Sequence, residues 1–354
     1  MFENLRNVTS TGPVLITGHT GFKGSWLTML LDQLGIENFG ISLPPESNSH
    51  ANLLGMDARA SQNYLDIRDL ESLSSKIQEI SPSVIIHMAA QPIVSKAFEH
   101  VGETFYTNVQ GTVNVIESSR IAKSVKSFAV ITTDKVYSND ALHNTSHVED
   151  DPLGADEPYG LSKVGTELVV DAYNSTEPDI NKKFYTFRSG NVIGGGDLAL
   201  NRLLPDLGRH IFDGRELQVR NPNASRPWQH VLDTLYGYLL GIEHNLSGEF
   251  ERAFNFSPAE ESLTVQQVIN IAEKRFNMGF NLSNSSTSSS VHEDTLLNLN
   301  SHKSREILGW KNLFTQAEAV EDTLLWWKAY SEGESVEGLA RESIENYLES
   351  SKAK

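Results

Sequence analysis

Three closely spaced glycines near the start of the chain constrain its fold more than any other feature. Gly18, Gly21 and Gly24 follow the apolar run Val14 to Ile16. The leucines after them repeat at i, i+3, i+4 and i+7, the spacing of one helix face: Leu27, Leu30, Leu31 and Leu34. In such a motif the glycines permit a tight turn, a close approach of backbone N–H groups to a pyrophosphate, and close packing of helix on sheet. The stretch predicts a dinucleotide-binding loop, with an ordinary strand-turn-helix connection as the alternative.

Composition limits the classes of protein to consider. The 354 residues are 39% apolar, enough for one large core or two smaller ones. There is no cysteine, no long apolar span and no cationic apolar leader, so we expect a soluble, cytoplasmic protein without disulfides. The net charge of −17 disfavours binding to nucleic acid or to an anionic membrane, and an anionic ligand would need a local basic pocket.

Strand and helix patterns alternate over the first half of the chain. Apolar runs predict strands at 37–43, 84–88, 128–132 and 184–187, and periodic segments predict helices near 70–80, 107–122 and 161–172. This order predicts an α/β fold with a doubly wound, mostly parallel Rossmann sheet and right-handed crossovers.

The texture of the sequence changes after Gly190. We expect a dinucleotide-binding domain over 1–190, with a later return near 228–257, and a smaller substrate-binding domain over 191–354. Near the end, Val320, Leu324 and Trp327 repeat at helical spacing, and a charged helix follows from about residue 336. After the second predicted strand, 42–46 offers neither the acid typical of NAD binding nor the arginine typical of NADP binding, so this choice stays open locally.

Tyr159 and Lys163 stand at i and i+4, which places both side chains on one helix face. A nearby ammonium favours the phenolate form of a tyrosine and makes it a better base towards an alcohol. The pair therefore favours proton transfer during alcohol oxidation. The alternative is a packed tyrosine with a surface lysine.

Thr133, Asp134 and Lys135 follow the predicted strand 128–132, at the end where open α/β sheets place their sites. Thr133 can hydrogen-bond a reacting hydroxyl. Asp134 and Lys135 add two titratable groups, more than a simple alcohol oxidation requires, and so indicate a second proton-transfer step. The alternative is an Asp-Lys ion pair on the surface.

Several blocks together resemble the extended short-chain dehydrogenase/reductase family, and within it the CDP-glucose 4,6-dehydratase group. They are Thr17 to Trp26, His87 to Pro92, Thr107 to Thr112, Thr133 to Lys135, Gly190 to Asp197, Arg220 to Pro222 and Arg226 to Val231. The likeness covers nearly the whole chain. The lysine after Asp134 and the block Arg226 to Val231 are its most specific parts.

The resemblance implies an NAD-dependent hydro-lyase that converts CDP-glucose to CDP-4-keto-6-deoxyglucose and water. Tyr159 would take the proton of the C4 hydroxyl while NAD is reduced, and Lys163 would hold the ribose and bias Tyr159. Water would leave across C5–C6 with Asp134 as the acid, and hydride would return to C6. Lys135 stands where related dehydratases carry a glutamate base, so a neutral Lys135 or another group must accept the C5 proton.

The same resemblance implies the residues that bind cofactor and substrate. The cofactor set is Gly18, Thr20, Gly21, Phe22, Lys23, Gly24, Asp66, Ile67, Ala89, Ala90, Gln91, Asn108, Tyr159 and Lys163, with Asp66 and Ile67 at the adenine. The substrate set is Asn191, Arg202, Arg220, Arg226 and His292, with Arg220 and Arg226 at the diphosphate and Asn191 at a phosphate or the sugar. Arg226 pairing with surface acids, and Asn191 capping a turn, are the alternatives.

Two features leave the exact substrate open and argue against a metal. The family usually has a Gly-Tyr-Asp-Pro-like approach to its tyrosine, whereas Gly154 to Pro158 departs from it, and the 138–148 segment lacks the expected aromatics. His143 and His147 share i, i+4 spacing but lack a helical context and an accompanying glutamate, so we expect no metal site.

Other functions remain as alternatives to the dehydratase. They are an epimerase or dehydratase acting on another nucleotide-hexose, and a non-catalytic NAD-binding regulator. The regulator would need neither the Tyr159–Lys163 pair nor the Asp134–Lys135 pair.

Apolar residues on the two central helices predict a homodimer. Val109, Val113 and Ile116 supply an inward stripe on the first helix, and Leu161, Val164 and Leu168 supply one on the second. Val115, Val169 and Val170 then lie on other faces and need cover. Related enzymes pair these helices across a two-fold axis as a four-helix bundle, which requires only one patch per subunit.

Overall fold

Short apolar runs form the strands of a parallel sheet in the computed structural model, which describes residues 1–59, 61–138, 146–177, 179, 184–219, 221–280, 283–284 and 298–353. The strands are β1 (Val14–Thr17), β2 (Asn38–Ser42), β3 (Gln62–Tyr64), β4 (Val84–His87), β5 (Ser127–Ile131), β6 (Phe184–Ser189) and β11 (Ala253–Phe256). Their order is β11-β6-β5-β4-β1-β2-β3, and every pairing is parallel. The predicted doubly wound α/β sheet is confirmed.

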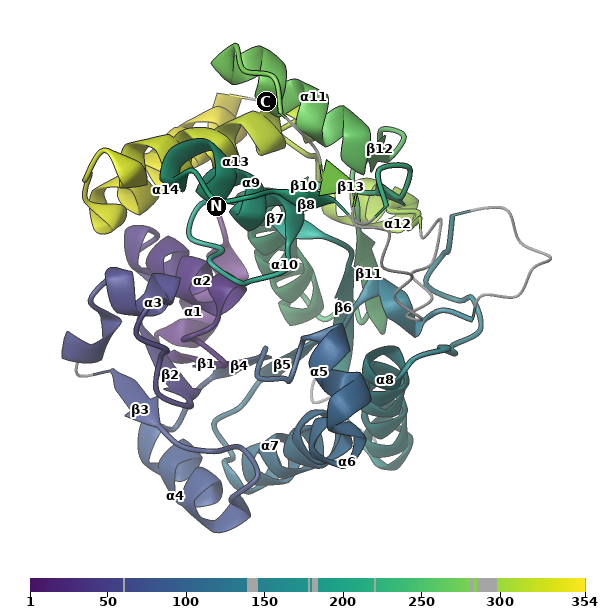
Figure 1. The fold of residues 1–354 in the computed structure, drawn as a ribbon. Coiled ribbons are helices and arrows are strands. Elements are labelled where there is room, and N and C mark those ends of the chain that lie inside the picture. The colour runs from purple at the N-terminus through teal and green to yellow at the C-terminus, as the bar shows by residue number, and fades with distance from the viewer. Residues whose placement is uncertain are drawn as a thin grey trace.

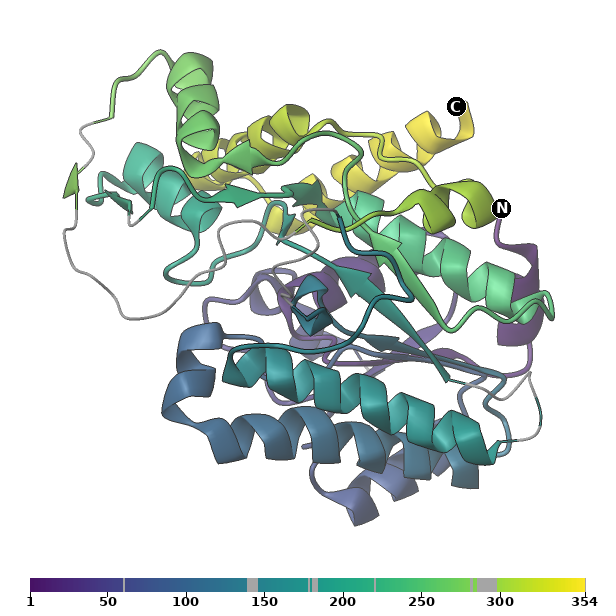
Figure 2. The same cartoon turned by 90° about the vertical axis from the view of Figure 1, so that its right-hand side faces the viewer.

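Helices cover both faces of this sheet (Figures 1 and 2). One layer holds α4 (Leu70–Ile80), α7 (Gly111–Ile121) and α8 (Pro158–Thr176), and the other holds α2 (Phe22–Gln33) and α10 (Val231–Leu246). Side chains alternate along a strand, so Val14 and Ile16 join the core under α2 and α10 while Leu15 joins the core under α4 and α7. Burial on both faces explains why the central strands β1, β4 and β5 are mostly apolar, whereas the edge strand β3 is polar.

Shorter elements complete the sheet part. They are α1 (Glu3–Thr9), α3 (His50–Leu53), α5 (Val94–Glu99), α6 (Val101–Phe105), the 3-10 turns Met56–Ala58 and Asp134–Val136, and the π-helical turn Tyr106–Gln110. In the part that the structure describes, no helix combines the length and the apolar character needed to cross a bilayer.

The rest of the chain builds a smaller part, on top in Figure 2. Its helices are α9 (Leu203–Asp213), α11 (Val265–Phe276), α12 (His302–Leu308), α13 (Gln316–Ser331) and α14 (Val336–Ala353). Its short strands pair as β7 (Val192–Ile193) with β10 (Gln229–His230), β8 (Gln218–Val219) with β13 (Ser283–Asn284), and β9 (Ser225–Arg226) with β12 (Leu263–Thr264). Val320, Leu324 and Trp327 are buried on α13, so the predicted terminal helices are confirmed.

The chain returns to the sheet within the predicted segment 228–257. There α10 packs on the sheet and β11 extends it beside β6. The division into domains at residue 190 stays a proposal. Arg220, His292 and His143 lie outside the described residues, as does most of the serine-rich segment 281–290.

The predicted inward stripe of α8 is wrong for two of its three residues, while Val164 is half-buried and packs on a small core cluster. Leu161 and Leu168 are 42% and 57% exposed, whereas Val170, which we expected on another face, is fully buried. The buried face of α8 carries polar residues, including Lys163 and Glu167, because groups on the sheet bind them. Hydrophobic periodicity cannot recognise a buried face of this kind.

On the first helix the prediction is correct for Ile116, which is buried. Val115 is buried as well and therefore needs no cover from a partner. Val109 and Val113 are only half-buried.

Candidate active site

The glycine loop joins β1 to α2 at the carboxyl edge of the sheet. Gly18 has a φ of +76°, and a Cβ there would collide with the backbone of Ala89 after β4. A Cβ at Gly24 would collide with the Gly18 carbonyl, so glycine lets the start of α2 lie against the loop. A loop of this kind at a helix N-terminus fits the pyrophosphate of a dinucleotide.

Other predicted cofactor residues surround this loop. Thr20 Oγ1 lies 2.6 Å from Ser42 Oγ and donates to the Leu43 carbonyl at 3.1 Å, which ties the loop to the end of β2. Asp66 is held by Arg68 Nη2 at 2.6 Å, and Ile67 is buried under Gly111. The predicted adenine contacts stay predictions.

Asn108 connects the segment after β4 to the start of α8. Its Oδ1 accepts from the Gln91 backbone N–H at 2.7 Å, and its Nδ2 donates to the Gln91 carbonyl at 3.1 Å and to Ser162 Oγ at 2.8 Å. The Gln91 side chain donates to Thr104 Oγ1 at 3.0 Å. The amide groups of Asn108 thus hold the segment with Ala89, Ala90 and Gln91 against the helix that carries Tyr159.

A glutamate fixes the start of α8. The Glu157 carboxylate accepts from the backbone N–H groups of Tyr159 and Gly160 at 2.7 and 2.8 Å, and Pro158 occupies the first helical turn. This cap sets the position of Tyr159 beside the end of β5. Sequence analysis missed Glu157, although an acid directly before a proline is a typical helix-start signal.

The expected shift of Tyr159 towards phenolate beside Lys163 is not seen among the groups that the structure contains. Burial, together with the Asp134 and Glu157 carboxylates, raises the pKa of Tyr159 despite a hydrogen bond with Thr133. Lys163 Nζ donates instead to the Ile131 carbonyl at 3.0 Å, and burial, followed by Lys23, lowers the pKa of Lys163 to about 7. Burial penalises the charged forms of both side chains.

Asp134 lies buried directly after β5. Thr133 Oγ1 donates to Asp134 Oδ1 at 2.9 Å, and burial raises the pKa of the Asp134 carboxyl against the opposing effects of Thr133, Lys135 and Arg226. Lys135 Nζ lies 3.8 Å from Glu157 Oε1, which is the ion pair formed at this turn. The structure thus provides a buried carboxyl group, Asp134, that favours its protonated form. It also places Lys135 beside the Glu157 carboxylate.

Lys23, in the first turn of α2, reaches Tyr238 on α10. Its Nζ donates to the Tyr238 hydroxyl at 3.2 Å, which lies 2.8 Å from Ser189 Oγ at the end of β6. Burial, followed by the charge of Arg202, lowers the pKa of Lys23 to about 8. Lys23, Asp134 and Lys163 therefore act electrostatically within one site.

The predicted substrate-binding residues that the structure describes are Arg202, Arg226 and Asn191. Both arginines lie near enough to the proposed catalytic groups to act on their pKa values. Arg202, which pairs with Asp197 at 3.1 Å, acts on the pKa values of Lys23 and Tyr159, and Arg226 acts on that of Asp134. Arg226 Nη1 also donates to the Ser225 carbonyl at 2.8 Å. The Asn191 carbonyl accepts from the Gln229 N–H at 2.9 Å, which ties two of the resembling blocks together.

A buried ionic network behind Tyr159 was not predicted. The Glu167 carboxylate accepts from Thr132 Oγ1 at 2.7 Å, Thr186 Oγ1 at 3.0 Å, and Arg188 Nε and Nη2, both at 2.9 Å. Burial alone would raise the pKa of Glu167, but Arg188, together with Arg252 and Thr132, outweighs it and the pKa falls to about 2. The only signal in the sequence was the spacing of Glu167, four residues after Lys163 on the same helix face.

Residues 14–256 match the NAD dependent epimerase/dehydratase family. The chain belongs to this family. It is 34% identical over 346 residues to CDP-glucose 4,6-dehydratase of Salmonella typhimurium, covering 95% of this chain and 96% of that one. It is 27% identical to a UDP-glucose 4-epimerase of Erwinia amylovora, covering 74% and 82% of the two chains.

The fold agrees with solved structures of such enzymes. DesIV, a dTDP-glucose 4,6-dehydratase from Streptomyces venezuelae solved with NAD, superposes with a TM-score of 0.76 at 23% identity, covering 89% of this chain and 97% of that one. The family is NAD-dependent, and the loop formed by Gly18, Gly21 and Gly24 fits that cofactor. The chain is thus an enzyme of the dehydratase and epimerase class within the extended short-chain dehydrogenase/reductases.

Proposed function

We propose that this protein is a CDP-glucose 4,6-dehydratase, which forms CDP-4-keto-6-deoxyglucose and water. The observation that carries the proposal is the buried Asp134 carboxyl, whose pKa is raised beside Tyr159. Oxidation of an alcohol requires one acid-base group, and elimination of water requires a further acid at the leaving hydroxyl. The likeness to the Salmonella typhimurium CDP-glucose enzyme supports this substrate.

In the first stage Tyr159 takes the proton of the C4 hydroxyl, which Thr133 holds in place. NAD, when bound, would supply a reversible hydride carrier, which takes hydride from C4 here and gives it back at C6 after the elimination, as C5 regains its proton. Because burial raises the pKa of Tyr159, positive charge near the phenol assists this step, and the Arg202 guanidinium acts in that direction. Lys163 lies on the same helix face, one turn away.

In the second stage the 4-keto group acidifies the C5–H bond and Asp134 gives a proton to the departing C6 hydroxyl. The C5 proton would pass to the Lys135–Glu157 pair, in which Lys135 Nζ lies 3.8 Å from Glu157 Oε1. With Lys135 held as an ammonium in this pair, the Glu157 carboxylate is the member that can accept a proton. Lys135 and Glu157 would together take the place of the glutamate base of related dehydratases.

A panel of glucose nucleotides tests this function. The protein with NAD is incubated with CDP-, dTDP-, UDP- and GDP-glucose, and products are read by their 4-keto absorbance in alkali. We expect a signal with CDP-glucose and none with Tyr159→Phe, in which the ring still packs but the proton acceptor is gone. Conversion of UDP-glucose to UDP-galactose without a 4-keto product would instead establish an epimerase.

We further propose that the enzyme is a homodimer that pairs through the outer face of α8. Leu161 and Leu168 are exposed there, and Phe105 and Tyr106 are exposed on the neighbouring helical turns. These turns contact α8. An isologous contact requires only this one patch on each subunit.

A further inference from the structure

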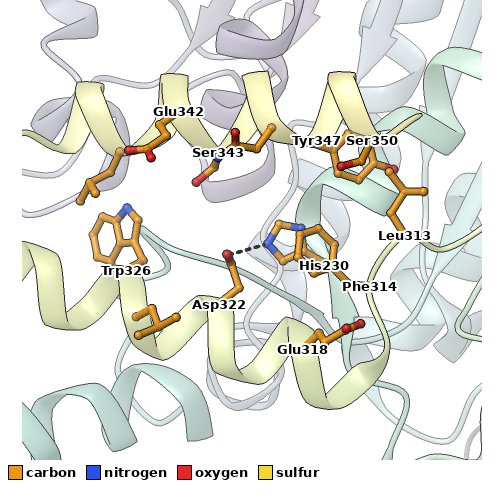
Figure 3. Close-up of a pocket in the computed structure, with 13 residues that line it drawn as sticks. His230, Leu313, Phe314, Glu318, Asp322, Trp326, Glu342, Ser343, Tyr347 and Ser350 are labelled. Carbon is orange, nitrogen blue, oxygen red and sulfur yellow. Dashed lines mark hydrogen bonds and ion pairs between the residues drawn. The ribbon is translucent and has the colours of Figure 1, made fainter. Parts of the chain in front are cut away.

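Positive charge gathers at the carboxyl edge of the sheet, where the cofactor would lie. Lys23 acts on the pKa of Lys163, and Arg202 acts on that of Lys23. The pocket between α13 and α14, shown in Figure 3, has the opposite character. The acids among the residues that line it are Glu318, Asp322 and Glu342. Lys163 and Arg202 take part in the proposed oxidation, and Lys23 is the third cation beside them.

Lys23 is held by neutral groups. Its Nζ donates to Tyr238 Oη at 3.2 Å and lies 5.5 Å from the centre of the Tyr238 ring. Among the described residues, no carboxylate lies within ion-pair distance of this Nζ. Asp134 acts on Lys23 from further away, and burial favours the neutral form of Asp134. The positive charge of Lys23 is therefore not cancelled by an adjacent acid, and in a half-buried site it acts over a longer range than in water.

The glycine loop divides the cofactor site into two sides. In the sheet, β2 and β3 lie on one side of β1, and β4, β5 and β6 lie on the other. A dinucleotide with its pyrophosphate on this loop extends over both sides. The predicted adenine residues, Asp66 and Ile67, follow β3. Thr133 and Tyr159, which would meet the sugar C4, lie at the end of β5. Hydride passes between the nicotinamide and C4, so the nicotinamide belongs on the β5 side.

Lys23 extends towards the nicotinamide side. Its partner Tyr238 bonds Ser189, the last residue of β6, and β6 is the neighbour of β5 in the sheet. The next residue, Gly190, packs on Asp134, since a Cβ on Gly190 would lie 2.8 Å from Asp134 Oδ2. The ammonium group of Lys23 therefore lies at the same end of the sheet as the proposed acid-base groups.

We propose that Lys23 tunes the redox balance of bound NAD. The nicotinamide ring carries a positive charge in the oxidised cofactor and none in the reduced one. An ammonium group near the ring disfavours the oxidised form by repulsion, so the bound cofactor accepts hydride more readily. In the proposed reaction this charge would assist oxidation at C4 and set the balance against the return of hydride to C6. That consequence rests on the proposed function, whereas the effect on the cofactor requires only that the protein binds NAD.

Competition between the two cofactor forms tests the proposal without substrate. NADH fluoresces, so its displacement by NAD⁺ gives the dissociation constant of NAD⁺ divided by that of NADH. At a pH below the Lys23 pKa of about 8, we expect Lys23→Met to lower this ratio at least ~10-fold, equivalent to ~30 mV in the potential of the bound cofactor. A lysine in contact with the pyrophosphate would instead act on both forms alike, because the pyrophosphate is the same in both. Equal weakening of both forms, or an unchanged ratio, overturns the proposal.

Further variants separate the charge from the structure. Lys23→Gln keeps a donor for Tyr238 without the charge and should lower the ratio as Lys23→Met does, so the test does not depend on one variant. Lys23→Arg keeps the charge and should hold the ratio within ~3-fold of the parent protein. Lys126→Met removes an exposed positive charge directly before β5, at the opposite edge of the sheet, and should leave the ratio unchanged.

Two outcomes in these variants would contradict a role for the charge. They are a normal ratio in Lys23→Gln, and a ratio as low in Lys23→Arg as in Lys23→Met. Because the measurement uses no nucleotide sugar, its failure is distinct from a failure of the dehydratase proposal.

Discussion

At the scale of single residues, burial sets the proton affinities of the site. It raises the pKa values of Asp134 and Tyr159 and lowers those of Lys23 and Lys163. Each shift favours the neutral form, because a site shielded from water penalises charge. A neutral Asp134 can donate a proton.

Asp134→Asn should stall the reaction after oxidation. The amide fills the same space but cannot act as the acid at the C6 hydroxyl, whereas oxidation at C4 does not use this group. Single-turnover absorbance should show reduced cofactor that accumulates and persists. Asp150→Asn, at an exposed position, should turn over normally. Fast, complete turnover by Asp134→Asn would exclude the acid role.

Lys163 should make the cofactor-free protein more stable as pH rises above 7. Its pKa is about 7 in the folded protein against 10.5 in the unfolded chain, so between these values the unfolded chain binds the extra proton. The free energy of unfolding then rises by up to ~1.4 kcal/mol per pH unit. Urea unfolding at several pH values should show this slope, and Lys163→Met should lack its share of it. Identical slopes in the two proteins would contradict the lowered pKa.

At the scale of elements, the Glu167–Arg188 pair fixes α8 against β5 and β6. Glu167 bonds Thr132, the neighbour of Thr133, and Arg188 Nη1 donates to the Tyr137 hydroxyl at 2.8 Å. The network thus joins the helix that carries Tyr159 to the turn that carries Asp134. Glu167 and Arg188, which are not among the proposed substrate contacts, thus hold Tyr159 and Asp134 in a constant position relative to each other.

Glu167→Gln should reduce the free energy of unfolding by ~3–5 kcal/mol, because it leaves the buried Arg188 without its counter-charge. The double variant Glu167→Leu, Arg188→Met should recover much of this loss, since it leaves no uncompensated charge between these two positions. Asp171→Asn breaks a half-exposed pair with Arg252 and should cost less than ~1 kcal/mol. Urea unfolding measures all three, and a small loss for Glu167→Gln would show that the network contributes little.

At the scale of the whole molecule, the proposed dimer would cover the apolar face that α8 leaves exposed. Leu161 and Leu168 lie on that face, while Val169 packs partly against the core beneath α8. A charge at Leu168 should therefore affect association, whereas a charge at Val169 would also disturb the fold.

Leu168→Glu should dissociate the dimer, because the charge would be buried without a partner in the proposed apolar contact. Light scattering at micromolar concentration should give twice the chain mass for the parent protein and the chain mass for the variant. Met278→Glu, at an exposed apolar residue in the smaller part, serves as the control and should remain dimeric. A parent protein of monomer mass at every concentration would refute the dimer.

The sequence by itself determined the features that depend on local order along the chain. These features are the glycine spacing, the alternation of strands and helices, and the positions of Tyr159, Lys163 and Asp134. Each can be read from residues that are close together in the sequence. Because parallel strands end at one edge, this order was sufficient to place the site there.

Tertiary structure decided which partners those residues meet. The leucines of α8 predict an apolar buried face, but α8 buries the polar face with Glu167 because Arg188 on β6 lies opposite it. The pairing of Lys135 with Glu157 and the hydrogen bond of Lys23 to Tyr238 likewise depend on packing between segments that are apart in the sequence. The pKa shifts follow from the same packing, because the exclusion of water is a property of the assembled fold rather than of any local stretch.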